Sequence, residues 1–171
     1  MTVPAPEHAV EPCSIARALE VIGDAWSILV LRDAFRGIRR FDDLQRDLAI
    51  AKPVLADRLK RLVDAGVLEL RQYRDHPPRF EYRLTPMGRD LSPALVALMR
   101  WGDTHLSRGG GPPVVLVHEQ CGHELDQSFV CWSCDQTFTP TDIASRPGPG
   151  SGAAAPPPHP GGARVRSRRS G

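Results

Sequence analysis

The sequence lacks a long hydrophobic run, and no stretch approaches the roughly 18 apolar residues that a membrane-spanning helix needs. Its first residues, MTVPAPEHAVEP, also lack the basic start and apolar middle of a secretory signal peptide. No internal repeat is visible. These absences predict a cytoplasmic protein with no membrane partner, in which disulfides are disfavoured.

Composition divides the 171 residues into five segments. A flexible lead-in is expected at residues 1–12, and the periodic hydrophobic pattern of one folded domain runs over residues 13–107. A Gly- and Pro-rich linker follows at 108–113, then a segment at 114–143 that holds three of the four cysteines. Residues 144–171 are rich in Pro, Gly and Arg and are predicted to be a disordered tail.

Hydrophobic periodicity predicts an order of helices, a β-ribbon and a further helix. Helices are expected at residues 13–23, 24–37, 41–48 and 52–66, strands at 68–74 and 80–85, and a last helix at 87–106. The second helix is apolar over much of its surface and should be central. In the fourth helix, Pro53 suits the first turn and Gly66 the C-terminal end. The fold class is therefore mainly α with a small β-ribbon (α+β).

A short helix pair followed by a basic hairpin predicts a winged helix-turn-helix. Net charge is only +2, but the predicted domain carries 16 Lys and Arg against 13 Asp and Glu over residues 13–106. The hairpin connection contains Pro77 and Pro78, which should stiffen its tip, and Arg74 and Arg79 at its base can reach DNA phosphates. The alternative is an ordinary surface hairpin with incidental arginines.

The fourth helix would be the recognition helix, because Leu55, Leu59 and Leu62 share its inner face. Its N-terminus would enter the major groove and its outer basic residues would face phosphates, although a solvated face of mixed charge is the alternative. The candidate DNA-binding residues are Arg39, Arg40, Lys52, Pro53, Ala56, Asp57, Lys60, Arg61, Arg74, His76 and Arg79.

Over roughly residues 13–106 the sequence resembles the HxlR-type winged helix-turn-helix transcription regulators, which are small bacterial DNA-binding dimers. The resemblance rests on Cys13 and on the motifs IGDAWSILVLRD, RRFDDLQRDL, LADRLKRLVDAGVLE and PPRFEYRLTPMGRDLSPAL, with Trp101-Gly102 beyond them. It implies a regulator, with a repressor favoured, that binds a pseudo-palindromic operator in double-stranded DNA as a homodimer. This sequence departs from the family at Ala51 and Lys52, where a capping Ser or Thr is common.

The resemblance also implies that the first and last helices form the dimer contact. An apolar stripe of Leu91, Leu95, Leu98 and Trp101 fits that role, or else packs on its own domain. Some members of the family use a cysteine at the position of Cys13 to sense oxidants or electrophiles, and the start of a helix lowers a thiol pKa. Cys13 is thus a candidate redox sensor, or a small residue half buried at the dimer contact, and a small-molecule or redox effector is a candidate partner.

The cysteine-rich segment suggests a metal site. His118 and Cys121 have the same two-residue separation as Cys131 and Cys134, which suits tetrahedral Zn²⁺. We therefore expect a zinc-ribbon-like segment with structural Zn²⁺, in which His123 is the alternative fourth ligand. A disulfide between Cys131 and Cys134 is the competing explanation.

Two other functions compete with DNA binding. A small zinc-dependent enzyme or redox protein would need an open metal position and a general base, for which Glu119 and Glu124 are candidates. A protein-interaction module whose helix-turn-helix does not touch DNA is the third reading. Because all four presumed ligands look structural, we expect the chain not to be an enzyme.

Overall fold

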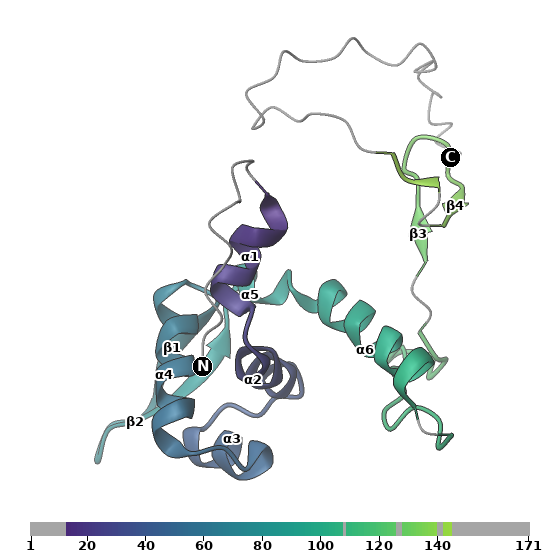
Figure 1. Cartoon of the computed structure of the whole chain (residues 1–171). Helices are drawn as coiled ribbons and strands as arrows, with labels where there is room; N and C mark the ends of the chain where they lie inside the picture. Colours follow the sequence, from purple (N-terminus) through teal and green to yellow (C-terminus); the bar gives the residue numbers. More distant parts are fainter. Residues whose placement is uncertain (1–12, 108, 126–127, 140–141, 145–171) are drawn as a thin grey trace, which may run out of the picture. The chain divides into compact units, whose positions relative to one another are not determined.

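The computed structural model describes residues 13–107, 109–125, 128–139 and 142–144, which belong to two compact units, residues 1–113 and 114–171 (Figure 1). The predicted flexible lead-in lies outside the described residues, as do residues 145–171 of the predicted tail. Within the described parts of the chain, no helix is long and apolar enough to cross a membrane.

The first unit has the predicted order of helices, β-ribbon and helices (Figure 1). Its elements are α1 (Ser14–Ile22), α2 (Ala25–Phe35), α3 (Phe41–Leu48), α4 (Lys52–Asp64), β1 (Leu68–Arg74), β2 (Arg79–Leu84), α5 (Pro86–Arg89) and α6 (Ser92–Leu106). The two strands pair antiparallel, from Leu68 opposite Leu84 to Arg74 opposite Arg79, with an irregularity between Gln72 and Arg74. This arrangement is a helix-turn-helix, α3 and α4, followed by a hairpin wing, β1 and β2.

The core forms around α2, as its apolar sequence predicts. Helix α2 contacts α1, α3, α4, α6 and β2. Apolar side chains of these partners pack around it, so burial brings α4 and the wing to the same core. The buried hydrophobic residues are Val30, Leu31, Leu44, Leu48, Ile50, Leu55, Leu59, Leu62, Val67 and Leu68.

A polar contact at Asp24 holds α4 against the start of α2. The Asp24 carboxylate caps α2 by accepting from the backbone N–H groups of Trp26 and Ser27, both at 3.1 Å, and from the Ser27 hydroxyl. Arg58 of α4 donates from Nε to the same carboxylate at 2.8 Å. Burial raises the pKa of Asp24, but the hydrogen bonds from Ser27 and the charge of Arg58 outweigh burial and leave it below its usual value.

The end of α4 is closed by Gly66, as predicted. Gly66 has φ of +73°, and its N–H donates to the Val63 carbonyl at 2.9 Å while the Val67 N–H donates to the Leu62 carbonyl at 2.9 Å. This pairing is the Schellman arrangement of a helix C-terminus. The Thr85 hydroxyl then donates to the Gly66 carbonyl at 2.7 Å, which joins the end of the wing to the end of α4.

The predicted last helix at 87–106 is wrong in one respect, because two helices, α5 and α6, occupy this stretch. Thr85 caps α5 by accepting from the Gly88 N–H at 3.1 Å, and Pro86 lies in its first turn. In one continuous helix, Pro93 would have to donate to the Arg89 carbonyl, but proline has no N–H and its ring would clash there. Pro93 instead lies in the first turn of α6.

The second unit contains two short hairpins. An isolated bridge joins Val117 to Glu124, and β3 (Phe129–Val130) pairs antiparallel with β4 (Thr137–Phe138). The Phe129 and Phe138 rings lie 5.6 Å apart between centroids. Each hairpin holds one of the two predicted ligand pairs.

We predict that Asp24→Ala lowers the free energy of unfolding by about 1 to 2 kcal/mol, because it removes a helix cap and leaves Arg58 without its partner. Asp24→Asn should cost less, because asparagine also caps helices. The carboxylate pKa is lowered by folding, so its contribution should be present above pH 3.8 and disappear as pH falls through the folded pKa. Urea unfolding at several pH values measures both effects, and an Asp24→Asn protein that keeps the parent's full acid sensitivity would contradict this assignment.

Candidate nucleic-acid interface

The turn between α3 and α4 leaves the start of α4 exposed. Ala49 adopts the left-handed conformation, with φ of 48°, and Ile50 is buried behind the turn. Lys52, Pro53 and Ala56 are exposed on the first turn of α4. Ala51 is the N-cap residue of α4 and makes no side-chain hydrogen bond. As the sequence predicts, α4 therefore lacks the capping bond that a Ser or Thr would make.

The outer face of α4 carries the predicted charged residues, but several of them form ion pairs within the helix. Asp57 pairs with its neighbour Arg58, and Lys60 pairs with Asp64 at 2.5 Å. The hydrogen bond from Lys60 to Asp64 and the charge of that carboxylate raise the lysine pKa, so Lys60 stays protonated at neutral pH. Arg61 is exposed, and among the described residues no carboxylate pairs with it. Sequence reasoning placed these side chains on the outer face but did not predict their pairing, although Lys60 and Asp64 have the i,i+4 spacing of a helical ion pair.

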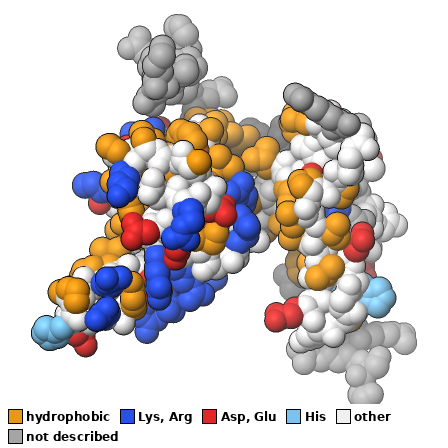
Figure 2. Space-filling model, turned by 90° about the horizontal axis from the view of Figure 1, so that it is seen from below, with side chains coloured by type: hydrophobic (Ala, Val, Ile, Leu, Met, Phe, Trp, Pro, Cys, Tyr) orange, Lys and Arg blue, Asp and Glu red, His pale blue; other side chains and the backbone are white. Residues whose placement is uncertain are grey.

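The wing presents Arg74, His76 and Arg79 as exposed residues. Arg74 donates from Nε to the His76 carbonyl at 3.1 Å, and the Gln72 amide donates to the Arg74 carbonyl and to Asp75, both at 3.1 Å. These local bonds order the connection between the strands and keep the cationic side chains at its surface. Figure 2 shows Lys and Arg side chains gathered along the projecting hairpin and the adjoining surface of the first unit.

A groove joins the base of the wing to the start of α3. The Arg40 guanidinium carbon lies 4.7 Å from the centroid of the Tyr73 ring, a cation–π contact that orients Arg40. Sequence reasoning named Arg40 as a candidate but missed Tyr73, because the contact joins residues 33 positions apart. It did not name Arg46, which lines the same groove. The groove has a volume of about 380 Å³ and is lined by Arg40, Phe41, Asp42, Asp43, Arg46, Tyr73, Arg79 and Phe80.

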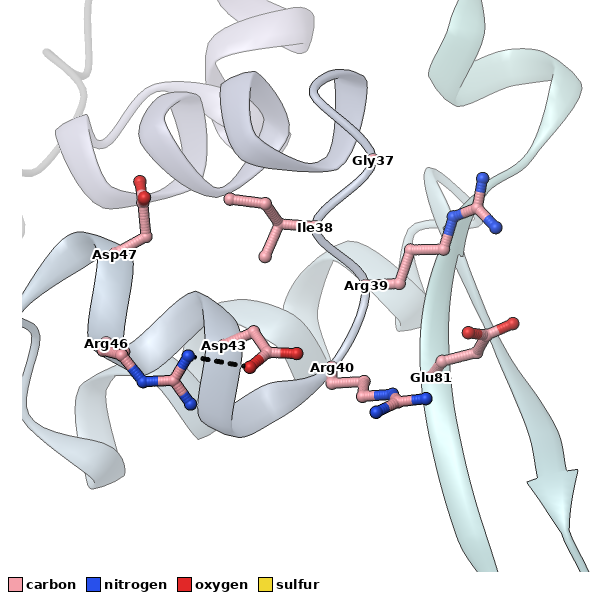
Figure 3. Close-up of a pocket in the computed structure, with 8 residues that line it drawn as sticks. All are labelled: Gly37, Ile38, Arg39, Arg40, Asp43, Arg46, Asp47 and Glu81. Carbon is pink, nitrogen blue, oxygen red and sulfur yellow. Dashed lines mark ion pairs between the residues drawn. The ribbon is translucent and has the colours of Figure 1, made fainter.

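A neighbouring hollow of about 760 Å³ surrounds the link between α2 and α3 (Figure 3). Its three carboxylates already have arginine partners: Asp43 pairs with Arg46 at 3.0 Å, Asp47 with Arg32 and Arg36, and Glu81 with Arg83. The backbone of this link is fixed because the Tyr82 N–H of β2 donates to the Arg39 carbonyl at 2.7 Å. Its lining residues are Gly37, Ile38, Arg39, Arg40, Asp43, Arg46, Asp47 and Glu81.

The predicted metal ligands form two separate pairs. His118 Nδ1 lies 3.2 Å from Cys121 Sγ, and the backbone N–H groups of Ser133 and Cys134 donate to Cys131 and lower the pKa of its thiol. In the part of the chain that the structure describes, no three His, Cys, Asp or Glu side chains come together to hold one ion. The four-ligand site therefore remains a prediction.

The candidate redox sensor belongs to the first unit. Cys13 is exposed and is the N-cap residue of α1, with extended backbone and no side-chain capping bond. A sensing role stays a prediction. The alternative, burial at a dimer contact, requires a second copy and stays a prediction as well.

Comparisons with known proteins agree with this architecture. Residues 21–109 match the family model described as HxlR-like helix-turn-helix. An uncharacterised HTH-type transcriptional regulator of Mycobacterium tuberculosis is 46% identical over 143 residues, which cover 84% of this chain and 90% of that protein. The HTH-type regulator YtcD of Bacillus subtilis is 33% identical over 107 residues, 62% of this chain and 85% of that protein.

Solved structures show the same likeness. The crystal structure of PA1607, assigned as a transcription factor, has a TM-score of 0.71 and 36% identity, and covers 78% of this chain and 94% of its own. The mycobacterial alignment of 143 residues is longer than the 113 residues of the first unit, so that relative shares sequence beyond the helix-turn-helix.

We predict that Arg79→Ala weakens binding to specific and random DNA by a similar factor, because a phosphate contact carries no sequence information. The slope of log affinity against log salt should fall by about one unit per chain. Affinity measured against salt on both DNAs tests this, with Arg17→Ala on α1, outside the proposed DNA-binding residues, as the control. Arg79→Ala protein that binds both DNAs as the parent does at every salt concentration would exclude the wing as a DNA contact.

Proposed function

The chain belongs to the HxlR-like helix-turn-helix family and is a DNA-binding transcriptional regulator, and we propose that it is a repressor that binds a pseudo-palindromic operator as a homodimer. The observation that carries this proposal is the exposed start of α4 beside a basic wing. A repressor needs only to occupy its operator, which the exposed start of α4 and the wing would do. We also propose a cytoplasmic location, with which a DNA-binding role agrees.

In the proposed complex, the start of α4 enters the major groove, where Lys52, Pro53, Ala56 and Asp57 face base edges. Asp57 pairs with Arg58 through Oδ2, and its other carboxylate oxygen can accept from a cytosine amino group. The wing and the groove beside it would contact phosphates. The proposed phosphate contacts are Arg39, Arg40, Lys60, Arg61, Arg74, His76 and Arg79.

Exposed apolar side chains on α1 and α6 support the homodimer. Ile15 is 71% exposed on α1, and Leu98 and Trp101 are 52% and 55% exposed on α6. Leu91 and Leu95 pack against the core, so only part of the predicted stripe is covered within one chain. Pairing two copies would bury the rest, and two-fold symmetry would match a palindromic operator.

We further propose that residues 114–143 form a zinc-ribbon-like unit that holds one structural Zn²⁺ through His118, Cys121, Cys131 and Cys134. Each hairpin already brings one pair of ligands together, and the N–H groups that donate to Cys131 favour its thiolate, the form that binds metal. Binding one ion would draw the two hairpins together, which is the usual coupling of zinc to the folding of small units. An enzymatic role for this cluster is not favoured.

The proposed operator contacts can be tested on the intergenic DNA beside the gene, searched for an inverted repeat. We expect Lys52→Ala or Asp57→Ala to change the preference at one operator position by about 1 to 3 kcal/mol, because base contacts are local. Asp57→Ala should leave the salt dependence nearly unchanged. A binding-site selection on each variant measures this, and unchanged base preferences in both would show that these residues do not read the sequence.

The zinc proposal predicts about one Zn²⁺ per chain by elemental analysis after adventitious metal is removed. Cys131→Ser should lose the metal and destabilise the second unit. Cys13→Ser, which alters a cysteine outside the ligand set, should keep it. Full zinc content in the Cys131→Ser protein would rule out the proposed ligand set.

A further inference from the structure

A third hollow of about 490 Å³ lies where the end of α2, the strand β2 and the start of α6 meet. Arginine provides all of its charged side chains: three arginines line it, and no aspartate or glutamate does. Such a surface attracts an anion. The lining residues are Ala34, Phe35, Gly37, Arg39, Tyr82, Arg83, Leu84, Arg89 and Ser92.

Two of the three arginines are held in place by other contacts. Arg83 donates from two nitrogens to the Glu81 carboxylate at 2.6 Å, and Arg89 donates from Nη1 to the Leu84 carbonyl at 2.8 Å. A guanidinium has five N–H groups, so both residues keep donors for a ligand. Fixed donors lose little conformational entropy when a ligand binds.

Arg39 differs from these two arginines. It is exposed, and no carboxylate in the described chain forms an ion pair with it. Figure 3 shows its side chain pointing away from α3, whereas Asp43 and Arg46 lie together on that helix. Its backbone is anchored to β2 through the Tyr82 N–H. A charged group that is anchored at its base and unpaired at its tip is suited to bind an incoming anion.

The remaining walls of the hollow are largely apolar. Phe35, Tyr82 and Leu84 are half-buried, and the small side chain of Ala34 leaves space between them. Burial raises the pKa of Tyr82, so its phenol is neutral and does not repel an anion at neutral pH. Apolar walls beside a few convergent polar groups are typical of small-molecule sites, and the volume lies in their usual range.

We propose that this hollow binds a small carboxylate with an apolar, ring-sized body, and that Arg39 is its principal charged contact. A guanidinium matches a carboxylate in a planar, two-bond geometry, while Phe35 and Leu84 cover the apolar part. A bare phosphate would satisfy the arginines but leave the apolar walls uncovered. The ligand therefore differs in chemistry from the DNA backbone.

The location gives such a ligand a route to regulation. Strand β2 belongs to the wing, and α6 carries the apolar face proposed for the dimer contact. Because Arg39 is also one of the proposed phosphate contacts, a bound ligand would occupy it and lower DNA affinity, by the same factor by which DNA lowers ligand affinity. This regulatory consequence rests on the proposed function, whereas ligand binding itself does not.

The test is calorimetric titration of the full-length protein without DNA, using benzoate, its neutral analogue benzamide, and inorganic phosphate. We expect saturable binding of benzoate, with benzamide and phosphate weaker by about tenfold or more, since each lacks either the charge or the apolar body. Arg39→Gln should weaken benzoate binding by about tenfold. Arg46→Gln, an arginine that lines the two neighbouring hollows instead, should not.

Several results would overturn the proposal. One is no saturable benzoate binding at about 10 mM, well above the millimolar affinity expected of a weak small-molecule site. Equal binding of benzamide would show that the charge is irrelevant, and equal binding of phosphate would identify a simple anion site. An equal loss in Arg46→Gln would indicate a diffuse charge effect. Because these titrations contain no DNA, their failure is distinct from failure of operator binding.

Discussion

The position of the recognition helix depends on one carboxylate. Asp24 caps α2 and accepts from Arg58, so the same group that starts the central helix also holds α4 against it. Burial of Leu55, Leu59 and Leu62 brings α4 to α2, but apolar contact alone tolerates sliding and rotation. The directional hydrogen bonds at Asp24 select one arrangement. The exposed start of α4 and the wing beyond Gly66 therefore depend on this contact.

A second polar network fixes α3. Arg32 and Arg36 of α2 each pair with both Asp33 and Asp47, so two arginines bridge two carboxylates on neighbouring helices. Asp33 is fully buried, burial raises its pKa, and its Oδ2 has no hydrogen-bond partner among the described residues. Such a network adds little net stability, since desolvation offsets the attraction. Its value is geometric, because the ion pairs to Asp47 fix the orientation of α3 against α2.

The sequence predicts those features that depend on local pattern. Leucine spacing identifies the inner face of α4, and Gly66 marks its end because only a residue tolerant of positive φ fits there. The contacts of Arg58 with Asp24 and of Tyr73 with Arg40 join residues more than 30 positions apart, so no local pattern contains them. The hollow around Arg39 likewise combines residues from α2, β2, α5 and α6. Its lining of three arginines without a carboxylate comes from residues that only the fold brings together.

The charge of the second unit separates its role from DNA binding. Its described residues include Glu119, Glu124, Asp135 and Asp142 but no lysine or arginine. A zinc ion held by three thiolates and one neutral imidazole would add a net charge of about −1, so metal binding would not turn this surface into one that attracts phosphate. The described residues of this unit are therefore unsuited to extend the DNA interface, whereas the Arg-rich residues 145–171 lie outside the described part. Zinc loss should act on its folding, while the basic surface of the first unit, built from α3, α4 and the wing, keeps its own charge and geometry.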